Sequence, residues 1–193
     1  ERYSPKESNY IMGLELAFKL EFYRAEYDAA MKIIHRAFEH PQFESAGLIS
    51  PKWHYFHSCL LFKMGRYKEA YRALDYTTPL LADKFGHNIT IRLLEIMILY
   101  HLQHLDIMET KILNVRQFIK RTHQGEEIFR PLTLIKILMK WYRHHYKFAE
   151  TIENSQEELK ALEDYHKEFP FDTSDFELIR LEIWLENHLR GLG

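Results

Sequence analysis

One stretch decides the fold: Met64-Gly65-Arg66-Tyr67-Lys68-Glu69-Ala70-Tyr71-Arg72-Ala73-Leu74. Gly65 permits a sharp turn between two antiparallel helices, Tyr67 is expected to wedge between them, and Ala70 lets them approach closely. An earlier copy places Tyr27 and Ala30 each 40 positions before Tyr67 and Ala70. Because helix-pair signals that recur at a fixed period are typical of stacked repeats, the sequence predicts an all-α protein, an α-solenoid of antiparallel helix pairs.

Length and composition set the class of protein. The chain has 193 residues, of which 46% are hydrophobic, 15% aromatic and 28% charged, so we expect a packed core and a water-soluble protein. The single cysteine, Cys59, excludes an internal disulfide and fits a reducing compartment, so we expect a cytoplasmic protein. No run approaches the roughly 18 to 20 apolar residues of a membrane span. The chain starts at Glu1 with no signal peptide in view, which fits a fragment of a longer protein.

Helix boundaries follow from the scarce glycines and prolines, 7 and 6 in number, most of which stand where a helix starts or ends. Ser4-Pro5 and Ser50-Pro51 each supply a capping serine and a proline at the first helical position. The apolar spacing predicts about nine helices. They run from about 5 to 22, 24 to 39, 51 to 64, 67 to 82 and 89 to 104, then through Ile112 to Ile119, through Phe129 to Met139, from Thr151 to Lys167, and from about 173 to 190.

The repeat is expected to continue in a weaker form and to end in a cap. Aligning Leu74 with Leu113 gives a degenerate third copy 39 positions on, without the glycine or the tyrosine. The last helix, started by the polar run 172–175, has no pair and is expected to be the capping helix that a solenoid needs. Its inward residues are expected to be Phe176, Ile179, Ile183 and Leu189. We therefore expect 1–193 to form a single domain.

These motifs resemble those of tetratricopeptide-repeat (TPR) proteins. The matching residues are Gly65, Tyr67, Ala70 and Leu74, with Ser58 in the preceding helix, and Tyr27, Ala30, Ile34, Ala37 and Pro41 in the other copy. The likeness is good over residues 8–83 and rests on spacing alone over 88–123. The period near 40 departs from the family's 34, and His54 stands where the family's first helix usually has a tryptophan. The resemblance is therefore to the wider TPR-like superfamily.

In that family the first helix of each pair lines a concave groove that holds a peptide. The resemblance thus implies a non-enzymatic scaffold that binds a protein or peptide ligand. Carried over by position, the groove residues are Lys52, Tyr55, Cys59, Phe62 and Lys63 in the second pair and Met12, Glu15 and Lys19 in the first. An aromatic stripe at helical spacing is also typical of a core, so packing of Tyr55 and Phe62 against neighbouring helices stays an open alternative.

No catalytic or metal-binding pattern accompanies the repeat. Twelve histidines include pairs such as His54 with His57, but two ligands are too few for a zinc site, so we expect no metal and no cofactor. Cys59 lies between apolar neighbours and is expected to be a small buried hydrophobe rather than a nucleophile. Glycine-rich phosphate loops and the Gly-x-Ser-x-Gly elbow are absent from the sequence, so we do not expect an enzyme.

Charge is distributed unevenly along the chain. Segment 111–147 holds nine Lys or Arg against two Glu, and the residues from 148 onward hold twelve acids against four bases, while the whole chain is at −2. We expect the acidic end to pack against the basic segment and to neutralise part of it. The alternative is an RNA- or polyanion-binding face. Its residues are Arg116, Lys120, Arg121, Lys140 and Arg143. The near-neutral chain makes a nucleic-acid partner unfavoured, and the sequence does not predict an oligomeric state.

Overall fold

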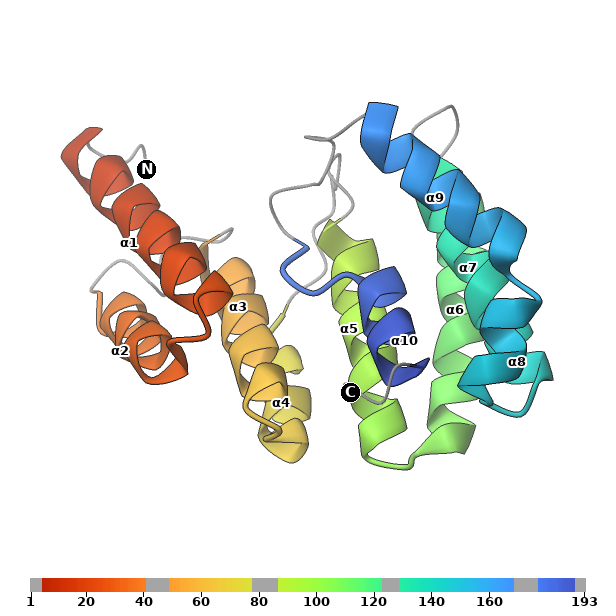
Figure 1. Cartoon of the computed structure of the whole chain (residues 1–193). Coiled ribbons are helices and arrows are strands. Elements are labelled where there is room, and N and C mark those ends of the chain that lie inside the picture. The colour runs from red at the N-terminus through yellow and green to blue at the C-terminus, as the bar shows by residue number, and fades with distance from the viewer. Residues whose placement is uncertain (1–4, 41–48, 78–86, 123–128, 169–176, 190–193) are drawn as a thin grey trace. The chain divides into compact units, whose positions relative to one another are not determined.

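The computed structural model describes residues 5–40, 49–77, 87–122, 129–168 and 177–189 (Figure 1). Within these ranges the regular structure is entirely helical, which confirms the all-α prediction, and ten helices are present where about nine were expected. The chain divides into two compact units, Glu1–Pro79 and Leu80–Gly193. Each unit is described by itself, and the single domain and the solenoid stay predictions.

Unit 1, Glu1–Pro79, contains two helix pairs. Helices α1 (Pro5–Tyr23) and α2 (Tyr27–Phe38) form the first pair, and α3 (Ile49–Lys63) and α4 (Tyr67–Leu74) form the second. Contacts between α2 and α3 join the two pairs. Helix α4 ends at Leu74, earlier than the expected 82, and residues 78–86 lie outside the described part.

The core of unit 1 is built by aromatic rings between the first helices and by small residues within each pair. Phe18 of α1 is fully buried; its ring stacks on Phe56 of α3 at 5.1 Å and meets the edge of Trp53 at 6.0 Å. Ala30 and Ala70 are fully buried where the second helices meet the first. The hydroxyl of Ser58 donates a hydrogen bond of 2.8 Å to the carbonyl oxygen of Ala70, which fixes how closely α3 and α4 approach.

Each pair in unit 1 turns in the same way. Gly65 has φ +73° and Ala25, 40 positions earlier, has φ +60°. The amide of Glu26 donates to the carbonyl of Glu21 at 3.0 Å, and the amide of Arg66 donates to the carbonyl of Leu61 at 2.9 Å. A left-handed residue with this bond to the preceding turn is the Schellman ending of a helix. The 40-residue repeat is thus present in the backbone of unit 1.

The shared turn predicts that adding a methyl group at one copy destabilises unit 1, whereas removing a methyl group at the other copy stabilises it. We expect Gly65→Ala to lower the free energy of unfolding by about 1 kcal/mol, because an L side chain disfavours positive φ, whereas nothing lies within 4 Å of the added Cβ. We expect Ala25→Gly to raise it by up to about 1 kcal/mol for the same reason. Urea unfolding followed by circular dichroism measures both. Shifts of the same sign would contradict the shared turn.

A second prediction concerns the contact between α3 and α4. We expect Ala70→Leu to cost about 1 to 3 kcal/mol, because the larger side chain must force apart helices that the Ser58 hydrogen bond holds together. Lys68→Leu, at an exposed position of the same helix, is the control and should change stability by less than about 0.5 kcal/mol. Equal melting midpoints for the two variants would show that α3 and α4 do not meet at Ala70.

Unit 2, Leu80–Gly193, also contains two helix pairs, and two further helices pack on them. Helices α5 (His87–His101) and α6 (Leu105–Thr122) form one pair, and α7 (Phe129–Arg143) and α8 (Phe148–Glu153) form the next. Helix α9 (Gln156–Glu168) packs on α7 and α8, and α10 (Leu181–Leu189) packs on α5 and α8. The last helix therefore returns to the first pair of its own unit.

The same turn recurs in unit 2. Gln103 has φ +60° and His145 φ +50°, and the amides of His104 and Tyr146 donate to the carbonyls of Leu99 and Trp141 at 3.0 and 2.9 Å. The turn at Gln103 comes 38 residues after Gly65.

This 38-residue spacing corrects the alignment of the third copy. Ile112, 38 positions after Leu74, is buried, whereas the predicted equivalent Leu113 is exposed. The expected spacing of 39 was therefore wrong by one position. The position of the turn and the buried face of the second helix define the repeat, and both place Ile112 rather than Leu113 at the position that corresponds to Leu74.

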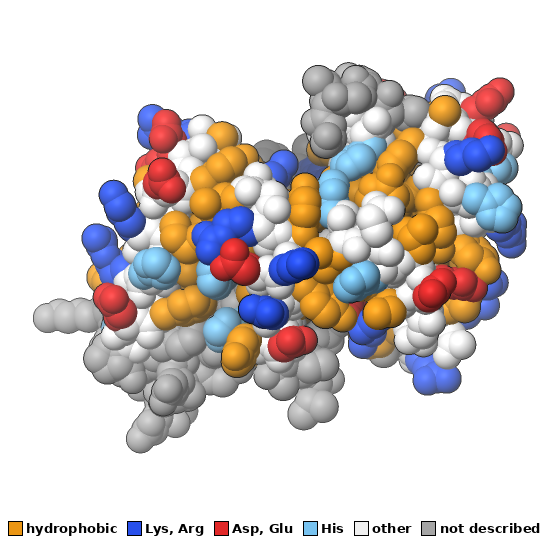
Figure 2. Space-filling model, turned by 90° about the horizontal axis from the view of Figure 1, so that it is seen from below, with side chains coloured by type: hydrophobic (Ala, Val, Ile, Leu, Met, Phe, Trp, Pro, Cys, Tyr) orange, Lys and Arg blue, Asp and Glu red, His pale blue; other side chains and the backbone are white. Residues whose placement is uncertain are grey.

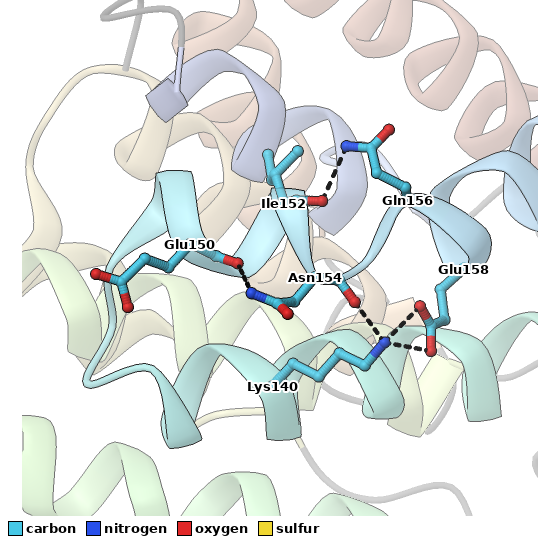
Figure 3. A network of polar contacts seen from close by, with 6 residues as sticks. All are labelled: Lys140, Glu150, Ile152, Asn154, Gln156 and Glu158. Carbon is cyan, nitrogen blue, oxygen red and sulfur yellow. Dashed lines mark hydrogen bonds and ion pairs between the residues drawn. The ribbon is translucent and has the colours of Figure 1, made fainter.

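The predicted helix Thr151–Lys167 is divided in two. Helix α8 begins earlier, at Phe148, and the chain turns at Asn154 and Ser155 before α9 begins at Gln156. Side chains bond the backbone around this turn: the Asn154 amide donates to the Glu150 carbonyl at 2.7 Å, and Lys140 of α7 donates to the Asn154 carbonyl at 2.6 Å (Figure 3). A lysine from another helix thus stabilises a break that local spacing does not reveal.

The last helix was also placed wrongly. It begins at Leu181, because residues 177–180 are not helical, and the predicted cap 172–175 and Phe176 lie outside the described residues. Leu181, Trp184 and Leu185 are buried, while Ile183, expected inward, is exposed. Ile179 is buried as expected, in the segment before the helix; the Leu189 side chain is outside the described part.

Candidate functional site

Three of the predicted groove residues come together in an ion-pair network on α1 and α3. The carboxylate of Glu15 lies 2.9 Å from the Lys19 ammonium on its own helix and 2.6 Å from that of Lys52 on α3. Both ammonium groups also lie near the ring of Phe56, at 5.9 and 5.6 Å from its centroid. The network joins the first helices of the two pairs in unit 1.

The protonation state of this network follows from its surroundings. Burial of Glu15 opposes its ionisation, but hydrogen bonds from Lys52 and Lys19 outweigh the burial and lower the pKa of the carboxyl below its ordinary value. Two ammonium groups therefore share the Glu15 carboxylate, which ties α1 to α3 at this surface.

The other predicted groove residues differ in exposure. Tyr55, Cys59 and Phe62 are buried, and Phe62 contacts Tyr67 of α4 with ring centroids 5.4 Å apart. Helix α3 is apolar around most of its circumference, which is typical of a helix enclosed by its neighbours. These three side chains therefore offer little surface to a ligand in the described structure, whereas Lys63 is exposed.

Helix α1 exposes a continuous apolar stripe that includes the predicted residue Met12. Met12, Leu16 and Leu20 are 59%, 65% and 55% exposed, and Tyr23 continues them at 66%. They lie three or four residues apart and so share one face of the helix. We call Met12, Leu16, Leu20 and Tyr23 the outer stripe.

The sequence contained a signal for the outer stripe that the prediction did not use. Helix α1 also buries Leu14, Phe18 and Phe22 on the opposite face. A helix with two apolar faces has one face more than its own core needs, so Leu16, Leu20 and Tyr23 are candidate binding residues that sequence reasoning missed.

Unit 2 contains an occupied counterpart of the predicted groove. The 38-residue offset places Tyr100 and His101 of α5 at the positions of Phe62 and Lys63. Both contact Trp184 of α10, with ring centroids 5.5 and 5.8 Å apart. The Trp184 indole nitrogen donates to Nε2 of His101 at 3.3 Å, and the rings of His101 and His188 are 5.2 Å apart. In unit 2, the face of α5 that corresponds to the predicted groove is therefore covered by α10 of the same chain.

The electrostatics of this contact favour a neutral imidazole. Burial lowers the pKa of His101 to about 4, and the nearby His188 adds to the effect. A neutral His101 has a lone pair on Nε2 that accepts the indole N–H of Trp184. The contact is thus an uncharged one at neutral pH, anchored by aromatic rings.

Several residues of the basic segment form ion pairs with acids. Lys111 pairs with Glu95 of α5 at 2.7 Å, and Lys140 pairs with Glu158 of α9 at 2.7 Å. Arg130 pairs with Glu177 at 2.6 Å. The contacts of Lys140 and Arg130 agree with partial neutralisation of the segment by the acidic end of the chain, whereas Lys111 pairs with a residue outside that end.

The remaining residues of the predicted polyanion site lie at the surface. Arg116, Lys120 and Arg121 on α6 and Arg143 on α7 are exposed. On the face that Figure 2 shows, the described Lys and Arg side chains are interspersed with acidic, histidine and hydrophobic ones. The alternative of polyanion binding stays a prediction that rests on these four residues.

The histidine pair His54 and His57 lies among aromatic rings. The ring of Phe38 contacts His54 at 5.0 Å and His57 at 5.6 Å, and burial lowers the pKa of His57 to about 4. Within the described ranges, no three His, Cys, Asp or Glu side chains are placed to share a metal ion. None of the described helices has the length and apolarity to cross a membrane.

Comparison of the chain with protein-family models, with curated proteins and with solved structures finds no match.

Proposed function

We propose that this chain is a non-enzymatic, TPR-like helical-repeat scaffold that binds another protein through the first helices of its pairs. The outer stripe of α1 carries the proposal, because Met12, Leu16 and Leu20 are each more than half exposed and adjacent on one face. Single apolar side chains at a surface are ordinary, whereas a contiguous apolar stripe on a folded domain marks an interaction site.

A second observation supports the same mode of binding. Helix α10 lies against α5 and α8, and the ring of Trp184 contacts those of Tyr100 and Trp141, with centroids 5.5 and 5.6 Å apart. An aromatic anchor from one helix set against the first helices of the repeat is the helix-in-groove mode of recognition. The chain thus carries its own example of a helix bound by its repeat.

A pulldown with matched variants tests the proposal. The wild-type chain is the bait at low and moderate salt, beside a double variant, Leu16→Glu with Leu20→Glu, in the outer stripe. Ile107→Glu with Leu113→Glu on α6 is the control, because both residues are exposed apolar side chains of unit 2. We expect a discrete protein, retained at moderate salt by the wild type and the control and lost by the outer-stripe variant.

Two results would overturn the proposal. One is recovery of the same proteins by the outer-stripe variant and the wild type. The other is a salt-sensitive yield of RNA that Lys120→Glu with Arg121→Glu abolishes, which would transfer the function to the basic segment.

A further inference from the structure

We propose that α10 is a pH-sensitive latch on α5, held while His101 accepts a hydrogen bond from the indole N–H of Trp184 and loosened when mild acid protonates that acceptor. The latch belongs to unit 2 and does not depend on the proposed function. The indole nitrogen of Trp184 lies 3.3 Å from Nε2 of His101. An indole nitrogen can only donate, so the bond requires the lone pair of a neutral imidazole.

A second histidine, His188 of α10, lies beside this bond. Its Nδ1 donates to the carbonyl oxygen of Trp184 at 2.9 Å, because a carbonyl can only accept. The rings of His188 and His101 are 5.2 Å apart. A proton on Nε2 of His101 therefore has two effects: it sets one N–H donor against another, and it places an imidazolium beside a second histidine. Both effects oppose the docking of α10.

Aromatic rings surround the two histidines. The ring of His188 stacks on Phe148 of α8 at 4.9 Å and lies 4.4 Å from that of Trp184. Tyr100 lies 5.7 Å from His101 on the same helix, and burial raises the pKa of its phenol above the ordinary value of 10.0, so it is neutral in mild acid. Burial is the largest cause of the lowered pKa of His101, since the rings keep water away from the charged form.

The charged groups of the helices around the contact interact with other side chains. The pairs are Glu95 of α5 with Lys111 of α6, Glu109 of α6 with Tyr142 of α7, Glu150 with Lys147 beside α8, and Glu182 of α10 with Arg130 of α7. Asp106 of α6 acts on the pKa of Tyr146. The charge that acts on the pKa of His101 is that of His188, and it lowers that pKa further.

The direction of the pH dependence follows from the pKa of His101. It is about 4 in the docked state, against an ordinary value of 6.5 that we expect when the ring is released into water. Docking is therefore fully favoured above pH 6.5 and weakens as the pH falls from 6.5 towards 4, because the released state binds the proton first. The full shift corresponds to roughly 30-fold weaker docking at pH 5, and solvent screening of a half-buried ring reduces our expectation to about tenfold.

Loosening of α10 changes the surface that unit 2 presents. The ring of Trp184 contacts those of Tyr100, Trp141 and Phe148, with centroids 5.5, 5.6 and 5.7 Å apart. These three residues belong to α5, α7 and α8, so departure of α10 uncovers aromatic rings from both helix pairs of the unit. Near neutral pH the latch keeps them covered.

One group of the same region titrates with the opposite sign. The pKa of Glu177, which pairs with Arg130, is raised by burial, so this carboxyl favours the folded arrangement as the pH falls. A pH profile of the wild type alone therefore mixes two effects. A variant that changes only His101 has the same Glu177 contribution, and comparison with it isolates the latch.

Amide hydrogen exchange of α10 in the full chain, divided by the intrinsic exchange rate at each pH, measures docking at pH 7.5 and pH 5. The test variant is His101→Gln, because glutamine offers an acceptor oxygen to the indole N–H and does not titrate in this range. His104→Gln is the matched control, since His104 is exposed and lies three positions further on. We expect the ratio of α10 protection at pH 7.5 to that at pH 5 to be about tenfold larger in the wild type and the control than in His101→Gln.

Three results would overturn the latch. One is an equal ratio in the wild type and His101→Gln. Another is an equal loss of protection at pH 5 in peptides from α5, α7 and α10, which would mean acid unfolding of the whole unit. If circular dichroism shows that His101→Gln does not fold, Trp184→Phe takes its place, because it keeps a ring and removes the donor; we expect a smaller ratio than in the wild type, and an unchanged ratio is the third result.

Discussion

Replacing Phe18 with alanine should lower the free energy of unfolding of unit 1 by about 3 to 5 kcal/mol. Phe18 is fully buried and contacts both Phe56 and Trp53, so its removal leaves a cavity between the first helices of the two pairs. The loss should exceed that of any single surface change, because it removes transfer free energy and packing contacts together.

Hydrogen exchange read by mass spectrometry localises this effect. We expect peptides from α1 and α3 to lose protection in Phe18→Ala, while peptides from α7 and α10 keep theirs. Leu16→Ala is the matched control, because Leu16 lies on the same helix and is 65% exposed, so it should change stability by less than about 0.5 kcal/mol. Equal losses of protection in the two variants would mean that the inner and outer faces of α1 have been assigned the wrong way round.

The turn signal illustrates what the sequence could predict. Gly65 marked one turn, because glycine adopts positive φ without strain, and its copy was found through Tyr27 and Ala30 rather than through the turn itself. The other described left-handed positions hold Ala25, Gln103, His145 and Tyr146, which carry no such local signal. Packing of the paired helices imposes the turn there at a cost of about 1 to 2 kcal/mol per residue. The spacing of the third copy was consequently misjudged.

The remaining differences arise from contacts between distant residues. The break between α8 and α9 depends on Lys140 reaching the Asn154 carbonyl across 14 positions, and apolar spacing within the segment does not encode it. The outer stripe escaped prediction for another reason: one spacing rule fits both faces of α1, and only burial separates Leu14 from Leu16. Of the predicted groove residues, Glu15, Lys19 and Lys52 form a connected ion-pair network, and Met12 lies in the outer stripe.

A buried ion triad holds α10 to α7 and carries the second large prediction. Nη2 of Arg130 lies 2.6 Å from Glu177 and 3.1 Å from Glu182. Both carboxylates are buried, and the same guanidinium contacts both of them. Burial raises the pKa of Glu177 above its ordinary value; the charge of Arg130 opposes this rise, and Glu182 adds to it. Arg180 nearby contributes a smaller lowering.

Arg130→Met should therefore destabilise unit 2 by about 3 to 5 kcal/mol at pH 7, because it removes the guanidinium that both buried carboxylates contact. The penalty should depend on pH. A raised pKa in the folded state means that stability falls as pH rises through and above the ordinary pKa of glutamate, near 4.5, since the unfolded chain then releases its proton first. Urea unfolding should accordingly show a smaller difference between Arg130→Met and the wild type at pH 4 than at pH 7.

Glu177→Gln separates charge from packing in this triad. It removes the excess negative charge and leaves the pair of Arg130 with Glu182, so we expect it to be neutral or stabilising at pH 7. Combined with Arg130→Met, it should recover part of the loss, because one buried carboxylate that contacted Arg130 remains instead of two. A penalty for Arg130→Met that is equal at both pH values and unchanged by Glu177→Gln would mean that Arg130 acts through its aliphatic stem. In that case α10 would be held chiefly by Trp184 and its aromatic neighbours.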